Sequence, residues 1–182
     1  MKQTDKYIAL LRGVNVSGRN QIRMADLCRL VTEIGGREVQ SYIQSGNLVF
    51  LAAARPTDME SKLEQTIERQ FKLKIPVLVR PAADWAAYVA GNPFPQESDL
   101  EPNRVMLALA KAAPKAEAVT ELRARCAGGE TIRQVGDALW IHFPGGVGST
   151  KISPALLDRL AGSPVTMRNW RTVLKLNEMT MS

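Results

Sequence analysis

The sequence is poor in histidine, cysteine and aromatic residues, and these shortages exclude several classes of protein. Its 182 residues include one His, two Cys and 5% aromatic residues. A structural zinc site needs about four Cys or His ligands, which this chain does not have. Cys28 and Cys126 form no Cys-x-x-Cys pair, which indicates a reducing compartment and no disulfide framework. We predict no metal site and no cofactor, although a metal site made of carboxylates alone stays open.

Long hydrophobic runs are also missing. No run approaches the ~18 apolar residues that cross a bilayer, and the run from Tyr7 to Leu11 is shorter than the ~7–15 residues of a secretory signal. Hydrophobic residues still make up 45% of the chain, which is enough to bury a core and excludes a disordered protein. We expect a cytoplasmic globular protein without a membrane partner.

The acidic residues are unevenly placed. The formal net charge is +6, and no acid occurs between Asp5 and Asp26 or between Asp158 and Glu178. Two such windows could build one positive patch if the fold brings them together, and the alternative is a scattered, solvated surface. The basic residues of the two windows are Lys6, Arg12, Arg19, Arg23, Arg159, Arg168, Arg171 and Lys175.

The first half of the chain alternates strand-like and helix-like patterns. The turn residues Ser45-Gly46-Asn47 predict a hairpin, and Thr57 and Glu60 form a capping-box pattern before the second helix. The order strand, helix, strand, strand, helix, strand is typical of the ferredoxin-like, or α-β plait, arrangement. The predicted elements cover residues 6–16, 24–34, 39–43, 48–51, 57–71 and 76–80, with further helical turns over 84–90.

The second half repeats this order after a Pro-rich segment, 93–102, which predicts a linker. We therefore predict an α+β protein of two tandem ferredoxin-like (α-β plait) subdomains, residues 1–92 and 103–182, with an additional C-terminal helix. Several strands are apolar on both faces, so we expect the other half, an extra helix or a second subunit to cover them. The predicted elements are 105–110, 115–126, 131–135, 138–143, a helix opening at Ser153-Pro154, 165–167 and 169–179.

Two loops of the first half are candidates for anion binding. Arg12 ends a strand beside a glycine and Asn15, and a planar guanidinium can bind two oxygens of a phosphate or carboxylate at once. The second candidate, Gln44-Ser45-Gly46-Asn47 in the hairpin turn, offers two amides and a hydroxyl around a glycine. Because the first and third strands of a plait are antiparallel neighbours, we expect Asn15 to lie near residues 45–47. The alternatives are an Arg that pairs with a carboxylate and an ordinary hairpin turn.

The second half offers two further candidates. A Gly-rich loop that ends at Lys151 precedes the helix at Ser153, but its residue order is not that of a phosphate-binding Walker loop. Arg168, Asn169 and Lys175 surround the start of the last helix, where Asn can cap the helix and the group could bind an anion. A flexible surface loop and a packed helix start are the alternatives.

Three ordered motifs carry a resemblance to a known family. They are Tyr7–Gly18 (YIALLRGVNVSG) followed by Met24, Tyr42–Phe50 (YIQSGNLVF) and Thr166–Leu176 (TMRNWRTVLKL), and both Asn92-Pro93-Phe94 and Lys151 fit the pattern. The chain resembles the bacterial domain-of-unknown-function 1697 family. Ser17, where Gly is common, and Arg171, where Asn is common, depart slightly from it. The resemblance implies two α-β plait subdomains and no known activity.

The leading hypothesis is a protein, an enzyme or a binding module, that binds a small anionic or phosphate-bearing ligand through its Arg/Asn/Gly loops. No Ser or Cys nucleophile has a convincing base, so we assign no catalytic residue. The alternatives are nucleic-acid binding, which the positive charge favours and the scarcity of aromatic residues disfavours, and an assembly protein without catalysis. The predicted ligand-binding residues are Arg12, Asn15, Ser45, Asn47, Lys151, Arg168, Asn169 and Lys175.

Overall fold

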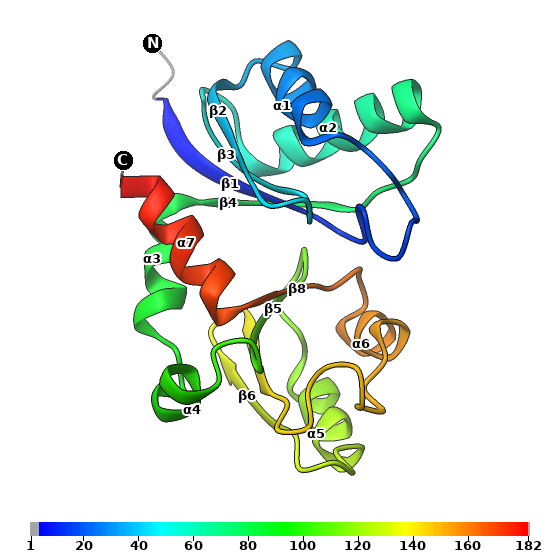
Figure 1. Cartoon of the computed structure of the whole chain (residues 1–182), viewed down its shortest axis with the longest axis vertical. Helices are drawn as coiled ribbons and strands as arrows, with labels where there is room; N and C mark the ends of the chain where they lie inside the picture. The colour runs from blue at the N-terminus through cyan, green and yellow to red at the C-terminus, as the bar shows by residue number, and fades with distance from the viewer. Residues whose placement is uncertain (1–3, 182) are drawn as a thin grey trace. The chain divides into compact units, whose positions relative to one another are not determined.

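The computed structural model describes residues 4–181 and is of the α+β class (Figure 1). Residues 1–3 and 182, at the ends of the predicted subdomains 1–92 and 103–182, lie outside the described residues. Within the described part, seven helices accompany two four-stranded antiparallel sheets. The chain divides into two compact units, which we call unit 1 (Met1–Ala86 with Leu176–Ser182) and unit 2 (Ala87–Lys175).

Unit 1 is built on a sheet in which β1 is a central strand. The strand order is β2-β3-β1-β4, and each neighbouring pair is antiparallel. Helices α1 and α2 lie over the same face of this sheet (Figure 1). The elements are β1 (Asp5–Leu11), α1 (Met24–Glu33), β2 (Arg37–Tyr42), β3 (Asn47–Ala52), α2 (Pro56–Phe71), β4 (Val77–Pro81) and α3 (Ala82–Ala90), whose last residues belong to unit 2.

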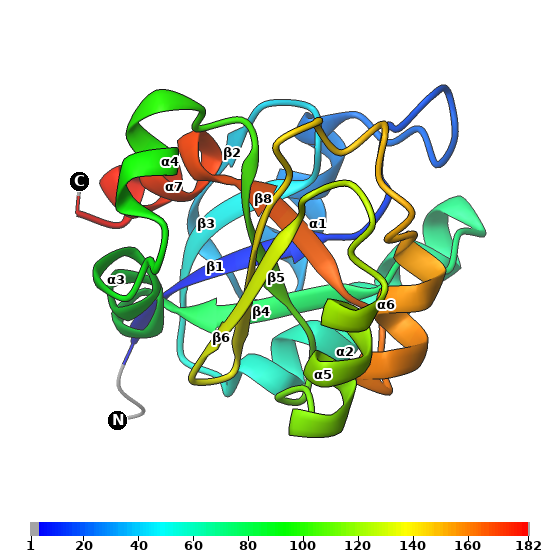
Figure 2. The ribbon, with the colours of Figure 1, turned by 90° about the horizontal axis from the view of Figure 1, so that it is seen from below.

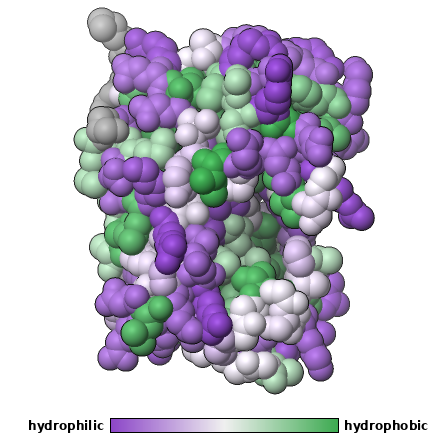
Figure 3. Space-filling model, in the orientation of Figure 1, coloured by the Kyte–Doolittle hydropathy of each residue, from purple (hydrophilic) through white to green (hydrophobic). Residues whose placement is uncertain are grey.

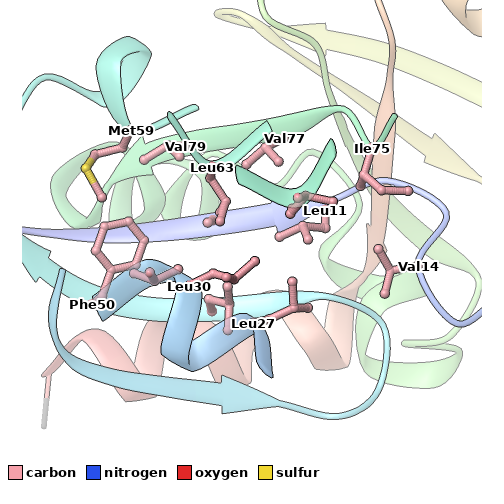
Figure 4. Close-up of a cluster of buried hydrophobic side chains, with 14 of the residues drawn as sticks. Leu11, Val14, Leu27, Leu30, Phe50, Met59, Leu63, Ile75, Val77 and Val79 are labelled. Carbon is pink, nitrogen blue, oxygen red and sulfur yellow. The ribbon is translucent and has the colours of Figure 1, made fainter. Parts of the chain in front are cut away.

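The core of unit 1 lies between its sheet and its two main helices. Alternate residues of β1 point to this side, and Leu11 packs there with residues of both helices (Figure 4). Burying one such leucine stabilises the fold by about 1.5–3 kcal/mol. The helix-facing cluster includes Leu11, Leu27, Leu30, Phe50, Met59, Leu63, Val77 and Val79.

α1 is followed by a pair of glycines, Gly35 and Gly36. A Cβ atom on Gly36 would lie 2.5 Å from Cγ1 of Val31, so the chain can turn back against the helix only with glycine there. The backbone N–H of Gly36 donates to the carbonyl of Val31 over 2.8 Å.

Unit 2 has a second sheet, in the order β6-β7-β5-β8. Helices α5 and α6 pack side by side, and their apolar residues share a core with the strands (Figure 2). On β7, Trp140 lies with its ring centre 5.8 Å from that of Trp170 at the start of the last helix. The elements are α4 (Pro95–Leu100), β5 (Val105–Leu109), α5 (Ala116–Ala124), β6 (Thr131–Val135), β7 (Ala138–His142), α6 (Pro154–Ala161), β8 (Thr166–Asn169) and α7 (Trp170–Met181), whose residues from Leu176 on belong to unit 1.

Three details of the sequence-based prediction need correction. The strand predicted over 6–16 ends at Leu11, because Gly13 and Asn15 adopt φ of 65° and 56° and turn the chain. The predicted capping box at Thr57 does not form, since α2 begins at Pro56 and Glu60 bonds elsewhere. The segment 93–102, predicted as a linker, contains α4.

The free edge of β4 is closed by two carboxylates of α2. The N–H groups of Val77 and Val79 donate to Oε1 of Glu64 and Glu60, each over 2.8 Å. Residues four apart on a helix rise about 6 Å, and residues two apart on a strand about 6.8 Å, so the two spacings match. Since unpaired N–H groups invite pairing with other chains, this contact protects the edge.

Within the described residues, no helix is long and apolar enough to cross a membrane.

We predict that Glu60→Ala lowers the free energy of unfolding by about 1–3 kcal/mol, because the buried N–H of Val79 loses its acceptor and Arg80 loses a carboxylate 3.7 Å away. Glu60→Gln keeps a side-chain carbonyl and should lose less. The measurement is urea denaturation. Glu68→Ala, on the same helix, removes only an exposed ion pair with Lys74 and should change stability by less than about 0.5 kcal/mol. Equal losses at positions 60 and 68 would contradict this role of Glu60.

Candidate functional site

The tip of the β2–β3 hairpin lies directly against the end of β1. The backbone N–H of Leu11 donates to the carbonyl of Gly46 over 2.8 Å. A Cβ atom on Gly46 would lie 2.7 Å from Cβ of Leu11, and its φ is 74°, so this approach needs glycine. The contact places residues 43–46 beside the loop that leaves β1.

The side-chain amide of Asn15 connects that loop to the hairpin. Its Nδ2 donates to the carbonyls of Ile22 (2.9 Å) and Gln44 (2.8 Å), and its Oδ1 accepts from the N–H of Ile22 (2.9 Å). Asn20 closes the same loop by donating to the carbonyl of Gly13 over 3.0 Å. Both N–H groups of the Asn15 amide are therefore engaged by backbone.

Left-handed backbone conformations concentrate at this place. Asn15, Ser17, Asn20 and Ile43 have φ between 48° and 56°. Asn adopts this conformation easily, but a β-branched residue such as Ile43 does so at a cost of about 1–2 kcal/mol. Strained residues often cluster at ligand sites, which makes this loop pair a candidate.

A hollow of about 380 Å³ lies between the loop and the hairpin, before the start of α1. Arg23 is the N-cap residue of α1, and its side chain makes no capping hydrogen bond. The N-terminus of a helix carries a partial positive charge, which favours anions. The lining residues are Asn15, Gly18, Gln21, Ile22, Arg23 and Gln44.

Arg23 is held at the hollow by a fork-shaped ion pair with Asp26. Nε of Arg23 lies 2.8 Å from Oδ2 of Asp26, and Nη2 lies 3.2 Å from Oδ1. This hydrogen bond, together with the attraction of opposite charges, raises the pKa of Arg23 and lowers that of Asp26. Both groups are therefore charged at neutral pH, and Asp26 neutralises part of the positive field.

The structure brings four predicted site residues of unit 1 into one region. Asn15 lines the hollow, and Arg12 is half-buried where the loop leaves β1. Asn47 is fully buried and donates to Oγ of Ser45 (2.9 Å) and to the carbonyl of Tyr42 (3.1 Å). Asn15 therefore lies beside the hairpin turn, as expected. The side chains of Asn15 and Asn47 hydrogen-bond to backbone carbonyls, and the side chain of Ser45 hydrogen-bonds to Asn47, so these residues stabilise the loop and the turn.

The predicted residues of unit 2 lie in different elements. Lys151 is exposed in the loop before α6. Arg168, on β8, donates to Oγ1 of Thr166 and to the carbonyl of Met167, each over 2.8 Å, and burial lowers its pKa to about 10. Asn169 caps α7 by accepting from the N–H of Thr172 over 2.9 Å, and Lys175 is half-buried on that helix.

Sequence reasoning missed Gln21, and it counted Arg23 only as part of a basic window, whereas Gln44 belongs to the candidate motif Gln44-Ser45-Gly46-Asn47. The hollow depends on the loop folding back onto the hairpin, which is a long-range event. Arg23 followed by Asp26 was the available signal, because oppositely charged residues at i, i+3 can form an ion pair on one side of a helix. A second hollow of about 560 Å³ includes Arg55, the N-cap residue of α2.

Comparison with known proteins gives a family. Residues 4–140 match the family described as "Protein of unknown function (DUF1697)". The chain belongs to the DUF1697 family. The match includes the first two sequence motifs and the whole candidate site in unit 1, whereas the closing motif 166–176 lies beyond it. No curated protein matches this DUF1697 chain.

Solved structures support the fold of this DUF1697 protein. The conserved bacterial protein SP0830 from Streptococcus pneumoniae is similar over 98% of this chain and 99% of its own, with 21% identity and a TM-score of 0.76. At 21% identity, this similarity shows that the two proteins share a fold and carries no information about function. An unknown protein from Galdieria sulphuraria aligns over 91% of this chain and 97% of its own, with 16% identity and a TM-score of 0.28, which carries no argument.

We predict that Asn15→Gly in this DUF1697 protein lowers the free energy of unfolding by roughly 2 kcal/mol, because three hydrogen bonds to backbone groups are lost. Glycine accepts the φ of 56° at this position, so the loss does not come from backbone strain. The measurement is urea denaturation. Ser17→Gly, at the equally left-handed and exposed position 17, is the control and should leave stability nearly unchanged. A neutral Asn15→Gly variant would contradict the role of the amide.

Proposed function

We propose that unit 1 binds a small anionic ligand, with a phosphate or carboxylate group, in the hollow before α1. The observation that carries the proposal is the meeting of a guanidinium, an uncapped helix start and two glutamine side chains around one hollow. The strain at Ile43 supports it, because nothing about a plain hairpin turn requires a β-branched residue there.

Each group has a distinct part in the proposed binding. Arg23 supplies the charge and can offer N–H donors to two oxygens. Gln21 and Gln44 can donate through their amides, while Asn15 holds the loop in position and does not itself bind. We propose no reaction, since no nucleophile or acid–base pair lies around the hollow.

Other sequence-based predictions remain proposals. We infer from the element order that both units are ferredoxin-like plaits. A cytoplasmic location is supported by the free thiols of Cys28 and Cys126. Anion binding by Lys151, Arg168, Asn169 and Lys175 stays a prediction. Nucleic-acid binding is supported only by the positive net charge of the chain. Assembly without catalysis is supported only by strands that are apolar on both faces.

We predict that Arg23→Ala weakens the binding of inorganic phosphate at least tenfold and leaves the melting temperature within about 2 °C, since the Arg23 side chain is 83% exposed. The measurements are isothermal titration with phosphate and thermal unfolding.

Arg55→Ala is the matched control. Arg55 is also an N-cap residue, with an equivalent fork to Asp58 (Nε–Oδ2 3.0 Å, Nη2–Oδ1 2.8 Å), but it lines the other hollow. This variant should bind phosphate as the wild type does. Loss of binding in Arg55→Ala alone would move the site to α2, and equal binding by all three proteins would refute the proposed function.

A further inference from the structure

The side chains that line the hollow before α1 offer a ligand very little apolar surface. Ile22 is part of the lining but is only 3% exposed, and Gly18 has no side chain. Pockets for small molecules are usually lined mostly by apolar and aromatic side chains, so this lining does not suit a ligand with a large apolar part. The other lining residues carry an amide or a guanidinium: Asn15, Gln21, Gln44 and Arg23.

Two of these polar side chains are not used by the fold. The amide of Asn15 bonds to the backbone of Ile22 and Gln44. The side-chain amides of Gln21 and Gln44, in contrast, make no hydrogen bond to another group of residues 4–181, and both residues are exposed. Each amide has a donor and an acceptor, and both can bond to a ligand without breaking a contact of the folded chain.

The charge of the lining suits one anionic group. Among the residues that line the hollow, Arg23 is the only charged one, and Asp26 balances part of its charge. The fork to Asp26 occupies Nε and Nη2 of the guanidinium, so Nη1 can donate to a ligand. A single cation of this kind fits a monophosphate or a monocarboxylate better than a ligand with several phosphates.

The size of the hollow indicates an organic ligand. Its volume of about 380 Å³ falls within the ~300–1,000 Å³ of pockets that bind small organic molecules. On the face drawn in Figure 3, hydrophilic residues predominate and hydrophobic ones appear mostly as separate small areas, so polar side chains alone distinguish no site. The hollow differs because two unbonded amides and a guanidinium line one cavity of this size.

We propose that the ligand of this hollow is a hydroxylated anion, in which one phosphate or carboxylate group binds at Arg23 and hydroxyl groups of the attached part bond to the amides of Gln21 and Gln44. The inference rests on the proposed function and adds the class of ligand. A hydroxyl group both donates and accepts a hydrogen bond, and so does an amide. Sugar phosphates and polyhydroxy acids have this chemistry, whereas alkyl phosphates have only the anionic part.

The test compares ribose 5-phosphate with pentyl phosphate on the full chain by isothermal titration. The two compounds have the same phosphate group and the same number of carbons, but only ribose 5-phosphate carries hydroxyl groups. Two hydrogen bonds between hydroxyl groups and amides should make it bind about tenfold more tightly. Gluconate and hexanoate repeat the comparison with a carboxylate, and the pair with the larger ratio identifies the anionic group.

The double variant Gln21→Met/Gln44→Met removes both amides and keeps the length of the side chains. Its preference for the hydroxylated compound should fall to about twofold or less. Its melting temperature should stay within about 2 °C of the wild type, because both glutamines are exposed and bond to no other side chain. Gln65→Met, at an exposed position of α2 outside the hollow, is the matched control and should keep the full preference.

The possible results separate the inference from the proposed function. If inorganic phosphate binds but the hydroxylated compounds bind no better than their alkyl counterparts, the ligand is a simple anion and only the inference fails. If the double variant keeps the preference, the hydroxyl groups bind elsewhere, and if it loses both preference and stability, the glutamines serve the fold; either result overturns the inference. If none of these anions binds the wild type, the proposed function fails and the inference fails with it.

Discussion

The close contact between Gly46 and Leu11 is the constraint on which the candidate site depends. Because the two backbones meet within hydrogen-bond distance at the last residue of β1, the hairpin tip has one position relative to that strand. The carbonyl of Gln44 then lies where the amide of Asn15 can reach it. The loop folds back onto the hairpin for this reason, and the hollow before α1 is a consequence of that folding.

Asparagine in a glycine-rich loop has two physical uses, and the structure separates them. Its amide can bind a ligand, or it can replace backbone partners where the chain turns through left-handed conformations. Asn15, Asn20 and Asn47 all bond to backbone carbonyls. The motif therefore predicts a place where two loops converge, and that convergence is observed, while the residues that line the hollow there include Arg23, Gln21 and Gln44.

Local signals in the sequence predict much of the fold. The apolar periodicity of α1 and the Ser153-Pro154 start of α6 depend on neighbours in the chain, and both are observed, with Ser153 accepting from the N–H of Leu156. Glu60 was misassigned because its pattern fits a cap, yet its partner is the N–H of Val79 on the edge strand. No spacing in the sequence indicates that partner, since it depends on how α2 lies across the sheet.

The difference between local signals and long-range contacts also explains why the sequence does not single out Ile43. An isoleucine after a tyrosine continues a strand pattern, so the sequence predicts a paired residue over 39–43, whereas β2 ends at Tyr42 and Ile43 begins the turn. A residue whose local preference contradicts its conformation raises the energy of the native state, and natural proteins carry such residues because they are rarely at their stability optimum. The conformation of this turn is set by the approach of Gly46 to Leu11, a long-range contact that no spacing in the sequence indicates. The surrounding fold can hold one strained residue in place, because a cost of about 1–2 kcal/mol is small beside the packing energy of the whole unit.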